Sequence, residues 1–110
     1  MMRQLFGIKI ANFVDEFRRA SLDQKLKMVE KPVLHFKKRI HNSYFAASVE
    51  YLCLESRIPI PDWVHNKKFF LEEPFFAGGL ESVKAFLLVE SPLPFRRRNI
   101  FVSENALARA

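Results

Sequence analysis

The side chains best suited to metal binding or catalysis are few in this chain and lie far apart. The three histidines are His35, His41 and His65, and none belongs to an HExxH motif or a similar ligand spacing. Cys53, the only cysteine, excludes an intramolecular disulfide and a cysteine-based zinc site. It falls in an apolar stretch typical of a buried helix, where a thiol behaves as a small hydrophobic group. We therefore expect no metal site and no cofactor.

Acid–base and nucleophilic chemistry find equally little support in the sequence. Glu72 and Glu73 are adjacent, so their carboxyl groups point in different directions instead of converging on one substrate. The pair Gly78-Gly79 lacks the lysine of a phosphate-binding loop and is typical of a turn. No serine stands in a GxSxG motif. The sequence therefore predicts that the protein is not an enzyme.

Basic residues dominate the charge of the chain, with 18 Lys and Arg against 12 Asp and Glu and a formal net charge of +6. Such a balance permits nucleic-acid binding without proving it. Two basic clusters on one face could follow a phosphate backbone while nearby aromatic rings stack on bases. No helix-turn-helix is evident. The candidate residues for nucleic-acid binding are Lys37, Lys38, Arg39, Arg96 and Arg98.

The arginine run Arg96-Arg97-Arg98 has three possible roles. If alternate residues of a compact segment face alike, Arg96 and Arg98 share a side and reach Glu72, Glu73 or a helix C-terminus. Arginine suits such pairing because its planar guanidinium binds carboxylates in bidentate geometry. The run would then clamp the C-terminal segment to the body of the protein. Docking of another protein and contact with RNA or DNA remain the alternatives.

An aromatic-rich arm between Trp63 and Phe76 gives the chain more aromatic residues than a core of this size needs. Trp and Arg are also the residues that most often dominate protein–protein interfaces. The sequence therefore predicts a site for a protein partner. Its candidate residues are Trp63, Phe75, Phe76, Arg96, Arg97 and Arg98.

The hydrophobic spacing that must position these residues is mostly helical. Phe6, Ile10, Phe13 and Phe17 recur at steps of three and four, as on one face of a helix. The expected helices span residues 2–20, 22–30, 38–56 and 80–89, with single turns after Asp62 and after Ser103 through Leu107, and an extended piece at 100–102. Pro92 and Pro94 are expected to close the helix at 80–89.

Two helices carry more specific expectations. Ser21 and Gln24 form a capping-box pattern at the start of the helix at 22–30. The inward face of that helix is expected to consist of Leu22, Leu26 and Val29. The helix at 38–56 is apolar over much of its circumference, so neighbours should cover it on several sides.

These elements predict one all-α domain over residues 1–110, a small multi-helix bundle with an irregular aromatic-rich segment at 67–79 and a short extended piece near the C-terminus. The apolar patch at the N-terminus is broken by Lys9 and Asp15 and lacks the cleavage site of a signal peptide. The apolar stretch at 85–89 is far shorter than the about 20 residues that span a bilayer. We expect a cytoplasmic protein that is not in a membrane.

The order of several short motifs resembles the C-terminal part of a family of small bacterial proteins. The pattern combines a Pro-x-Trp, a Phe-Leu, a Pro followed by aromatics, a Val-x-Ser-Pro and a Phe-Arg-x-Arg with Ile-Phe. The matching positions are Pro61, Trp63, Phe70, Leu71, Pro74, Phe75, Phe76, Val89, Ser91, Pro92, Phe95, Arg96, Arg98, Ile100 and Phe101. The segments FVDEFRRAS and AASVEYL are similar too. This sequence departs from the family in FLLVES and in Phe75-Phe76, where Trp is frequent.

The resemblance implies a more specific function than the residues alone indicate. Some members of that family look like partners of nucleotidyltransferase-type toxins, and some carry an added helix-turn-helix that this chain lacks. The leading hypothesis is therefore a non-catalytic protein-binding module, an antitoxin-like or regulatory partner of another bacterial protein. The alternative is a nucleic-acid-binding protein that uses its basic clusters.

Overall fold

The computed structural model describes residues 2–76, 90–103 and 106–108. This part of the chain is mostly helical, as predicted, with one very small pair of strands in addition. The helices are α1 (Met2–Arg19), α2 (Leu22–Val29), α3 (Arg39–Ser56) and α5 (Leu93–Arg97). Two 3-10 turns, η1 (Asp62–His65) and η2 (Lys67–Phe69), follow α3, and the strands are β1 (Phe75–Phe76) and β2 (Ile100–Phe101). The expected helix at 80–89 lies outside the described residues.

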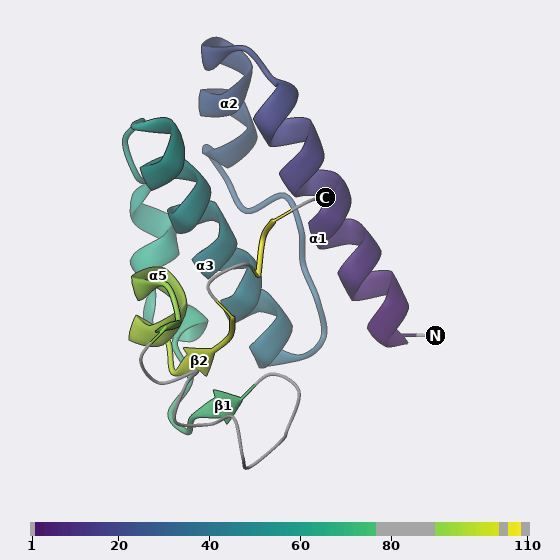
Figure 1. The fold of residues 1–110 in the computed structure, drawn as a ribbon, viewed down its shortest axis with the longest axis vertical. Coiled ribbons are helices and arrows are strands. Elements are labelled where there is room, and N and C mark those ends of the chain that lie inside the picture. The colour runs from purple at the N-terminus through teal and green to yellow at the C-terminus, as the bar shows by residue number, and fades with distance from the viewer. Residues whose placement is uncertain (1, 77–89, 104–105, 109–110) are drawn as a thin grey trace.

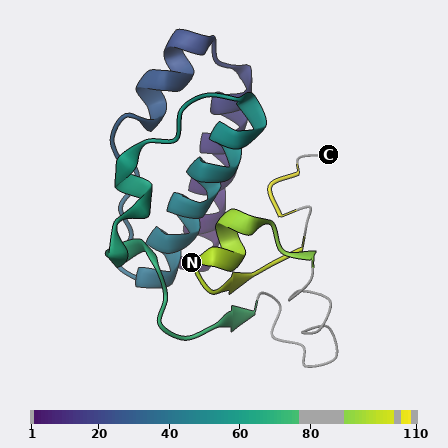
Figure 2. The ribbon, with the colours of Figure 1, turned by 90° about the vertical axis from the view of Figure 1, so that its left-hand side faces the viewer.

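Helix α3 is the centre of the fold, and α1, η1, η2 and α5 all contact it. The chain rises along α1, turns into α2 at one end of the molecule, and returns through residues 30–38 to begin α3 near the other end (Figure 1). After α3 it comes back along that helix through η1 and η2, and α5 lies against another side (Figure 2). Helix α3 is therefore covered on several sides, as its apolar circumference predicted.

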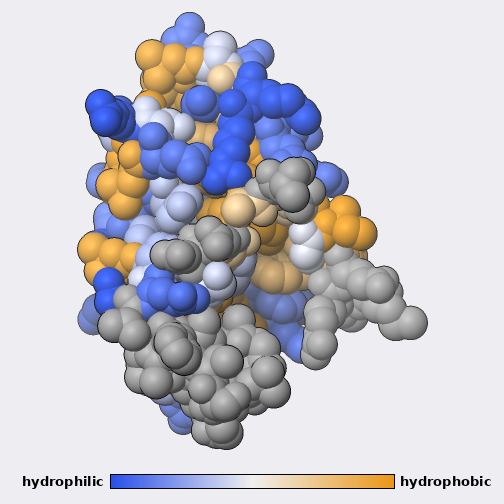
Figure 3. Space-filling model, viewed as in Figure 1, coloured by the Kyte–Doolittle hydropathy of each residue, from blue (hydrophilic) through white to orange (hydrophobic). Residues whose placement is uncertain are grey.

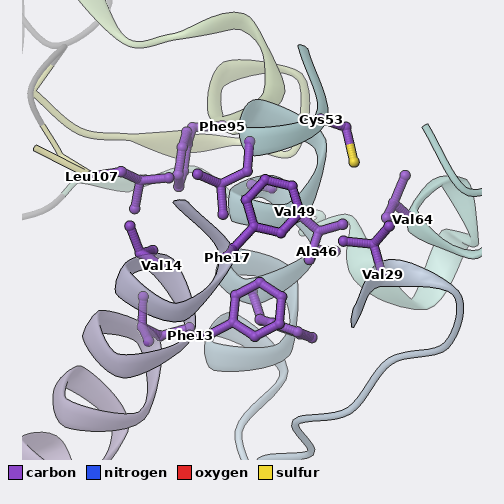
Figure 4. Close-up of a cluster of buried hydrophobic side chains, with 14 of the residues drawn as sticks. Phe13, Val14, Phe17, Val29, Ala46, Val49, Cys53, Val64, Phe95 and Leu107 are labelled. Atoms are coloured by element: carbon purple, nitrogen blue, oxygen red, sulfur yellow. The ribbon is translucent and has the colours of Figure 1, made fainter. Parts of the chain in front are cut away.

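The core forms where small residues of α3 let its neighbours approach closely. Residues 45–50 are all buried, and Ala46, Ala47 and Ser48 have no exposed surface. Phe13 and Phe17 of α1 reach toward Ala46 and Val49 of α3, with side chains from α2, η1 and the C-terminal segment around them (Figure 4). The helical face predicted for α1 is thus the one that is buried.

Helix α2 begins as predicted but presents a different face. The Ser21 hydroxyl accepts a hydrogen bond from the Gln24 N–H at 3.3 Å, and Gln24 Oε1 accepts one from the Ser21 N–H at 3.3 Å. The predicted inward face is wrong for Leu22 and Leu26, which are 60% and 39% exposed. Val29 is buried, as predicted. Lys25, one turn earlier on α2, also faces α1, and its ammonium lies over the Phe17 ring at 5.5 Å. A long lysine stem can cover apolar surface in this way while its charge stays in water.

Pro92 and Pro94 begin a helix that was not predicted from the sequence. Pro92 is the N-cap of α5 and Pro94 stands in its first turn, where a missing N–H costs nothing. Ser91 fixes this start, because its hydroxyl donates to the Val102 carbonyl and accepts from the Val102 N–H, both at 2.9 Å. The extended piece is confirmed as β2, although the expected helical turn after Ser103 falls partly outside the described residues.

Strand β1 pairs with β2 in parallel, with Phe75 opposite Ile100 and Phe76 opposite Phe101. Asn99 precedes β2 with a φ of 65°, a conformation that asparagine tolerates better than most residues. Its side-chain amide donates to the Leu71 carbonyl at 2.8 Å, which ties the aromatic-rich arm to the C-terminal segment.

Helix α3 ends at a strained position, and this gives a stability prediction. Arg57 is exposed and has a φ of 57°, where only glycine avoids a steric cost. Arg57→Gly should therefore raise the free energy of unfolding by about 1 kcal/mol. Urea denaturation followed by circular dichroism measures it. Arg19→Gly, at an exposed position in the last turn of α1, is the control and should destabilise by about 1 kcal/mol or less. A loss of stability in Arg57→Gly would contradict the prediction.

Candidate functional site

The last residue of the arginine run lies inside the protein. Arg98 has no exposed surface, and its Nη1 donates to Glu50 Oε1 at 2.6 Å and to the Pro94 carbonyl at 2.8 Å. Its Nη2 donates to the Val64 carbonyl at 2.7 Å, and its guanidinium lies over the Phe70 ring at 4.7 Å. One side chain therefore joins α3, α5, η1 and the segment after η2.

Glu50 is the carboxylate at the centre of this cluster. It is buried in the middle of α3, and its second oxygen pairs with Nη1 of Arg97 at 3.1 Å. Burial lowers the pKa of the Arg98 guanidinium from its ordinary value, and the hydrogen bond and charge of Glu50 act in the opposite direction. Arginine stays protonated in proteins, so the pair is ionic and its geometry is that of a structural clamp.

The predicted partners of the arginine run are corrected by this arrangement. Arg98 pairs with Glu50 of α3, whereas Glu72 and Glu73 were the expected carboxylates. Arg96 and Arg98 do not share a side either, because residues 93–97 are helical and positions two apart on a helix point away from each other. Arg96 is exposed while Arg98 is enclosed, so Arg98 offers no surface to a partner or a nucleic acid in this structure.

The aromatic arm is largely used within the fold. Trp63 is half-buried between Phe45 and Phe69, with ring centroids 5.9 and 5.5 Å away, and its indole N–H donates to the Val29 carbonyl at 2.8 Å. Phe76 stacks on the Phe101 ring at 5.0 Å. Among the proposed partner-binding aromatics, Phe75 is the most open, with 45% of its surface exposed.

The fold brings the basic cluster Lys37-Lys38-Arg39 close to a second one, Lys67-Lys68. Nη2 of Arg39 donates to the carbonyls of Lys67 and Phe70 at 3.1 and 2.8 Å, which fixes η2 against the start of α3. We define the basic surface as the five exposed side chains of Lys37, Lys38, Arg39, Lys67 and Lys68. Within residues 2–76, 90–103 and 106–108, no ion pair to a carboxylate involves any of the five. The charges are therefore available to an anion.

A hollow of about 300 Å³ opens within this surface. It is lined by His35, Phe36, Lys37, Arg39, Asn42, Lys68 and Phe69. Asn42 fixes one wall, because its side-chain oxygen accepts from the Phe36 N–H at 2.8 Å and its Nδ2 donates to the Phe36 carbonyl at 2.7 Å. Neither the hollow nor this asparagine was predicted, since no motif in the sequence marks them.

His41 lies beside the same wall and does not line the hollow. Its ring stacks on Phe6 with the centroids 3.9 Å apart. Burial first, and then the charge of Lys38, lower the pKa of His41 from its ordinary value of 6.5. The neutral ring is therefore favoured, as a stacked and partly enclosed imidazole requires.

The surroundings of Cys53 and of the potential metal ligands determine what chemistry these side chains could do. Burial, with a further contribution from Glu50, raises the pKa of the Cys53 thiol to about 11, so it is protonated at neutral pH and a weak nucleophile. Among the described residues, no three His, Cys, Asp or Glu side chains gather where they could hold a metal ion. The helices in this part of the chain include none with the length and apolarity needed to cross a membrane.

We found no match to a protein-family model, to a curated protein or to a solved structure. The resemblance to small bacterial antitoxin-like proteins therefore stays a prediction.

Proposed function

We propose that this protein is a non-catalytic binding protein whose basic surface contacts nucleic acid. The observation that carries the proposal is the pair of hydrogen bonds from Arg39 to the carbonyls of Lys67 and Phe70, which unites two basic clusters far apart in the sequence. Five adjacent cations without carboxylate partners in the described part of the chain repel one another. Phosphates relieve this repulsion and release counterions from the nucleic acid, which favours binding.

The test is the salt dependence of binding. A fluorescently labelled DNA duplex should bind the protein, and its affinity should fall steeply between about 50 and about 200 mM salt. Lys67→Gln/Lys68→Gln should lower the slope of log K against log[salt] by about 1.8, because each phosphate contact on a duplex contributes about 0.9. Anisotropy titrations of a single strand and of the duplex measure it.

The matched control for this test removes two charges elsewhere. Lys27 and Lys31 are exposed at and just after the end of α2, outside the basic surface. Lys27→Gln/Lys31→Gln changes the net charge by the same amount and should leave the slope nearly unchanged. Equal effects of the two double variants, or no binding at low salt, would reject the proposal.

Binding of a protein partner is the second candidate function. The exposed side chains of α5 and β1 favour it. Leu93 of α5 and Phe75 of β1 are 52% and 45% exposed, and both elements contact β2. Arg96 is exposed on α5 as well. This exposed group suits an antitoxin-like or regulatory contact. On the face shown in Figure 3, hydrophobic residues form separate patches between hydrophilic ones.

The test of this second candidate is co-expression with the product of a neighbouring gene. Phe75→Ala/Leu93→Ala should abolish the complex, whereas Leu22→Ala, at an exposed leucine of α2, should leave it intact. A complex that survives loss of both side chains would exclude this surface.

A further inference from the structure

The hollow within the basic surface has the size and lining of a small ligand site. Its volume of about 300 Å³ is at the lower end of the range for ligand pockets. Two separate parts of the chain build it, the segment from His35 to Asn42 and the η2 turn. A site of this size suits a compact anionic group with part of the molecule that bears it.

The cations around the hollow keep donors free for such a group. Arg39 directs Nη2 at two carbonyls, whereas its Nε and Nη1 have no partner among the described residues. Lys68 holds its ammonium 5.2 Å from the centre of the Phe69 ring, and Lys37 is exposed. The lining residues include no carboxylate in the part of the chain that the structure describes. The net charge of the lining is therefore positive at neutral pH.

Hydrogen bonds fix the backbone wall of the hollow and the Arg39 side chain before any ligand arrives. Asn42 binds both backbone groups of Phe36 and also donates to the Lys38 carbonyl at 3.3 Å. Phe36 packs edge-on against Phe6, with the centroids 5.0 Å apart, and Phe69 is buried. Apolar walls exclude water on one side, which strengthens hydrogen bonds between cations and an anion. Such preorganisation reduces the entropy that binding costs.

We propose that this hollow binds a terminal phosphate, the phosphomonoester at the 5′ end of a nucleic-acid strand or of a free nucleotide. A phosphomonoester carries a charge of about −1.5 to −2 at pH 7 and presents three acceptor oxygens, more than an internal phosphodiester offers. A concave site also accepts a terminal phosphate more readily than an internal one, because the strand must exit the site on both sides of an internal phosphate. The strand form of this proposal rests on nucleic-acid binding by the basic surface.

The experiment compares one oligonucleotide with a 5′-phosphate and with a 5′-hydroxyl, and titrates a nucleoside 5′-monophosphate separately. The phosphorylated strand should bind about tenfold more tightly, as charge-assisted hydrogen bonds to the extra group predict. Lys37→Gln/Lys68→Gln should abolish this difference, and Lys27→Gln/Lys31→Gln should preserve it. Changes in the NMR amide signals of residues 35–42 and 67–69 on addition of the monophosphate locate the site in the unmodified protein.

The possible outcomes separate this proposal from the one above. Equal affinity for the two strands, with no effect of the monophosphate on those amides, overturns the terminal-phosphate site and leaves salt-dependent binding standing. Binding of the monophosphate at those amides without binding of either strand supports the site and rejects the nucleic-acid function. Phosphorylation-dependent affinity that survives in Lys37→Gln/Lys68→Gln overturns the site as well, because the phosphate then binds elsewhere.

Discussion

Glu50→Gln should lower the free energy of unfolding by about 3–5 kcal/mol, one of the two largest effects that we expect. Glutamine has nearly the same shape, but it leaves the Arg98 guanidinium buried without a counter-charge. Arginine cannot escape this cost by losing its proton. Chemical denaturation followed by circular dichroism gives the loss directly.

The matched control for this change lies on the same helix. Glu55 binds Arg18 through two hydrogen bonds of 3.0 Å, but the two side chains are 42% and 29% exposed. Solvent screens such a pair, so Glu55→Gln should cost about 1 kcal/mol or less. Similar losses for Glu50→Gln and Glu55→Gln would contradict a buried ionic clamp.

A double-mutant cycle then separates the ion pair from the other contacts of Arg98. Arg98→Met alone leaves Glu50 with Arg97 and removes the donors of the Val64 and Pro94 carbonyls. Glu50→Gln/Arg98→Met removes both buried charges, so no charge is left buried without a partner. The double variant should therefore be more stable than the sum of the two single losses predicts. Strict additivity would mean that the two charges do not interact.

Phe45→Ala should cost about 3–5 kcal/mol, because it opens a cavity at the centre of the core. Phe45 is 1% exposed and lies between Phe13 of α1 and Trp63 of η1, with ring centroids 5.1 and 5.9 Å away. The indole loses a stacking partner, so the fluorescence of Trp63, the only tryptophan, should change in the folded state. Thermal and urea denaturation measure the stability.

Phe75→Ala removes the same atoms from an exposed position and serves as the control. Because Phe75 is 45% exposed, its loss should cost only about 1 kcal/mol and leave the fluorescence of Trp63 unchanged. A cost for Phe45→Ala no larger than this would mean that the core does not depend on the contact between α3 and η1.

The parts of the fold that could be predicted from the sequence are those determined by residues close together in the chain. Hydrophobic spacing is enough for α1 and α3, and the capping box of Ser21 and Gln24 places the start of α2 within one turn. The inward face of α2 could not be predicted, since α1 decides which side chains it covers. Helix α5 was missed because Pro92 and Pro94 fit a helix start as well as a helix end.

The candidate sites depend on contacts between distant parts of the chain. Arg98 and Glu50 are 48 positions apart, and Arg39 and Phe70 are 31 apart. The basic character of each cluster is evident in the sequence, whereas their meeting on one surface is set by the path of residues 57–70 along α3. A lone carboxylate in the apolar stretch AASVEYLCL was the one available signal for Glu50, because a buried charge requires a partner.

The burial of Glu50 also bears on how the protein assembles as it is made. The ribosome completes α1, α2 and α3 before it adds Arg97 and Arg98, the counter-ions of this carboxylate. Until then, enclosing Glu50 would leave a charge in apolar surroundings, so a water-exposed middle of α3 is favoured. The core should therefore pack over α3 only after residues 93–98 have been translated. The arginine run would then be needed for the last step of folding.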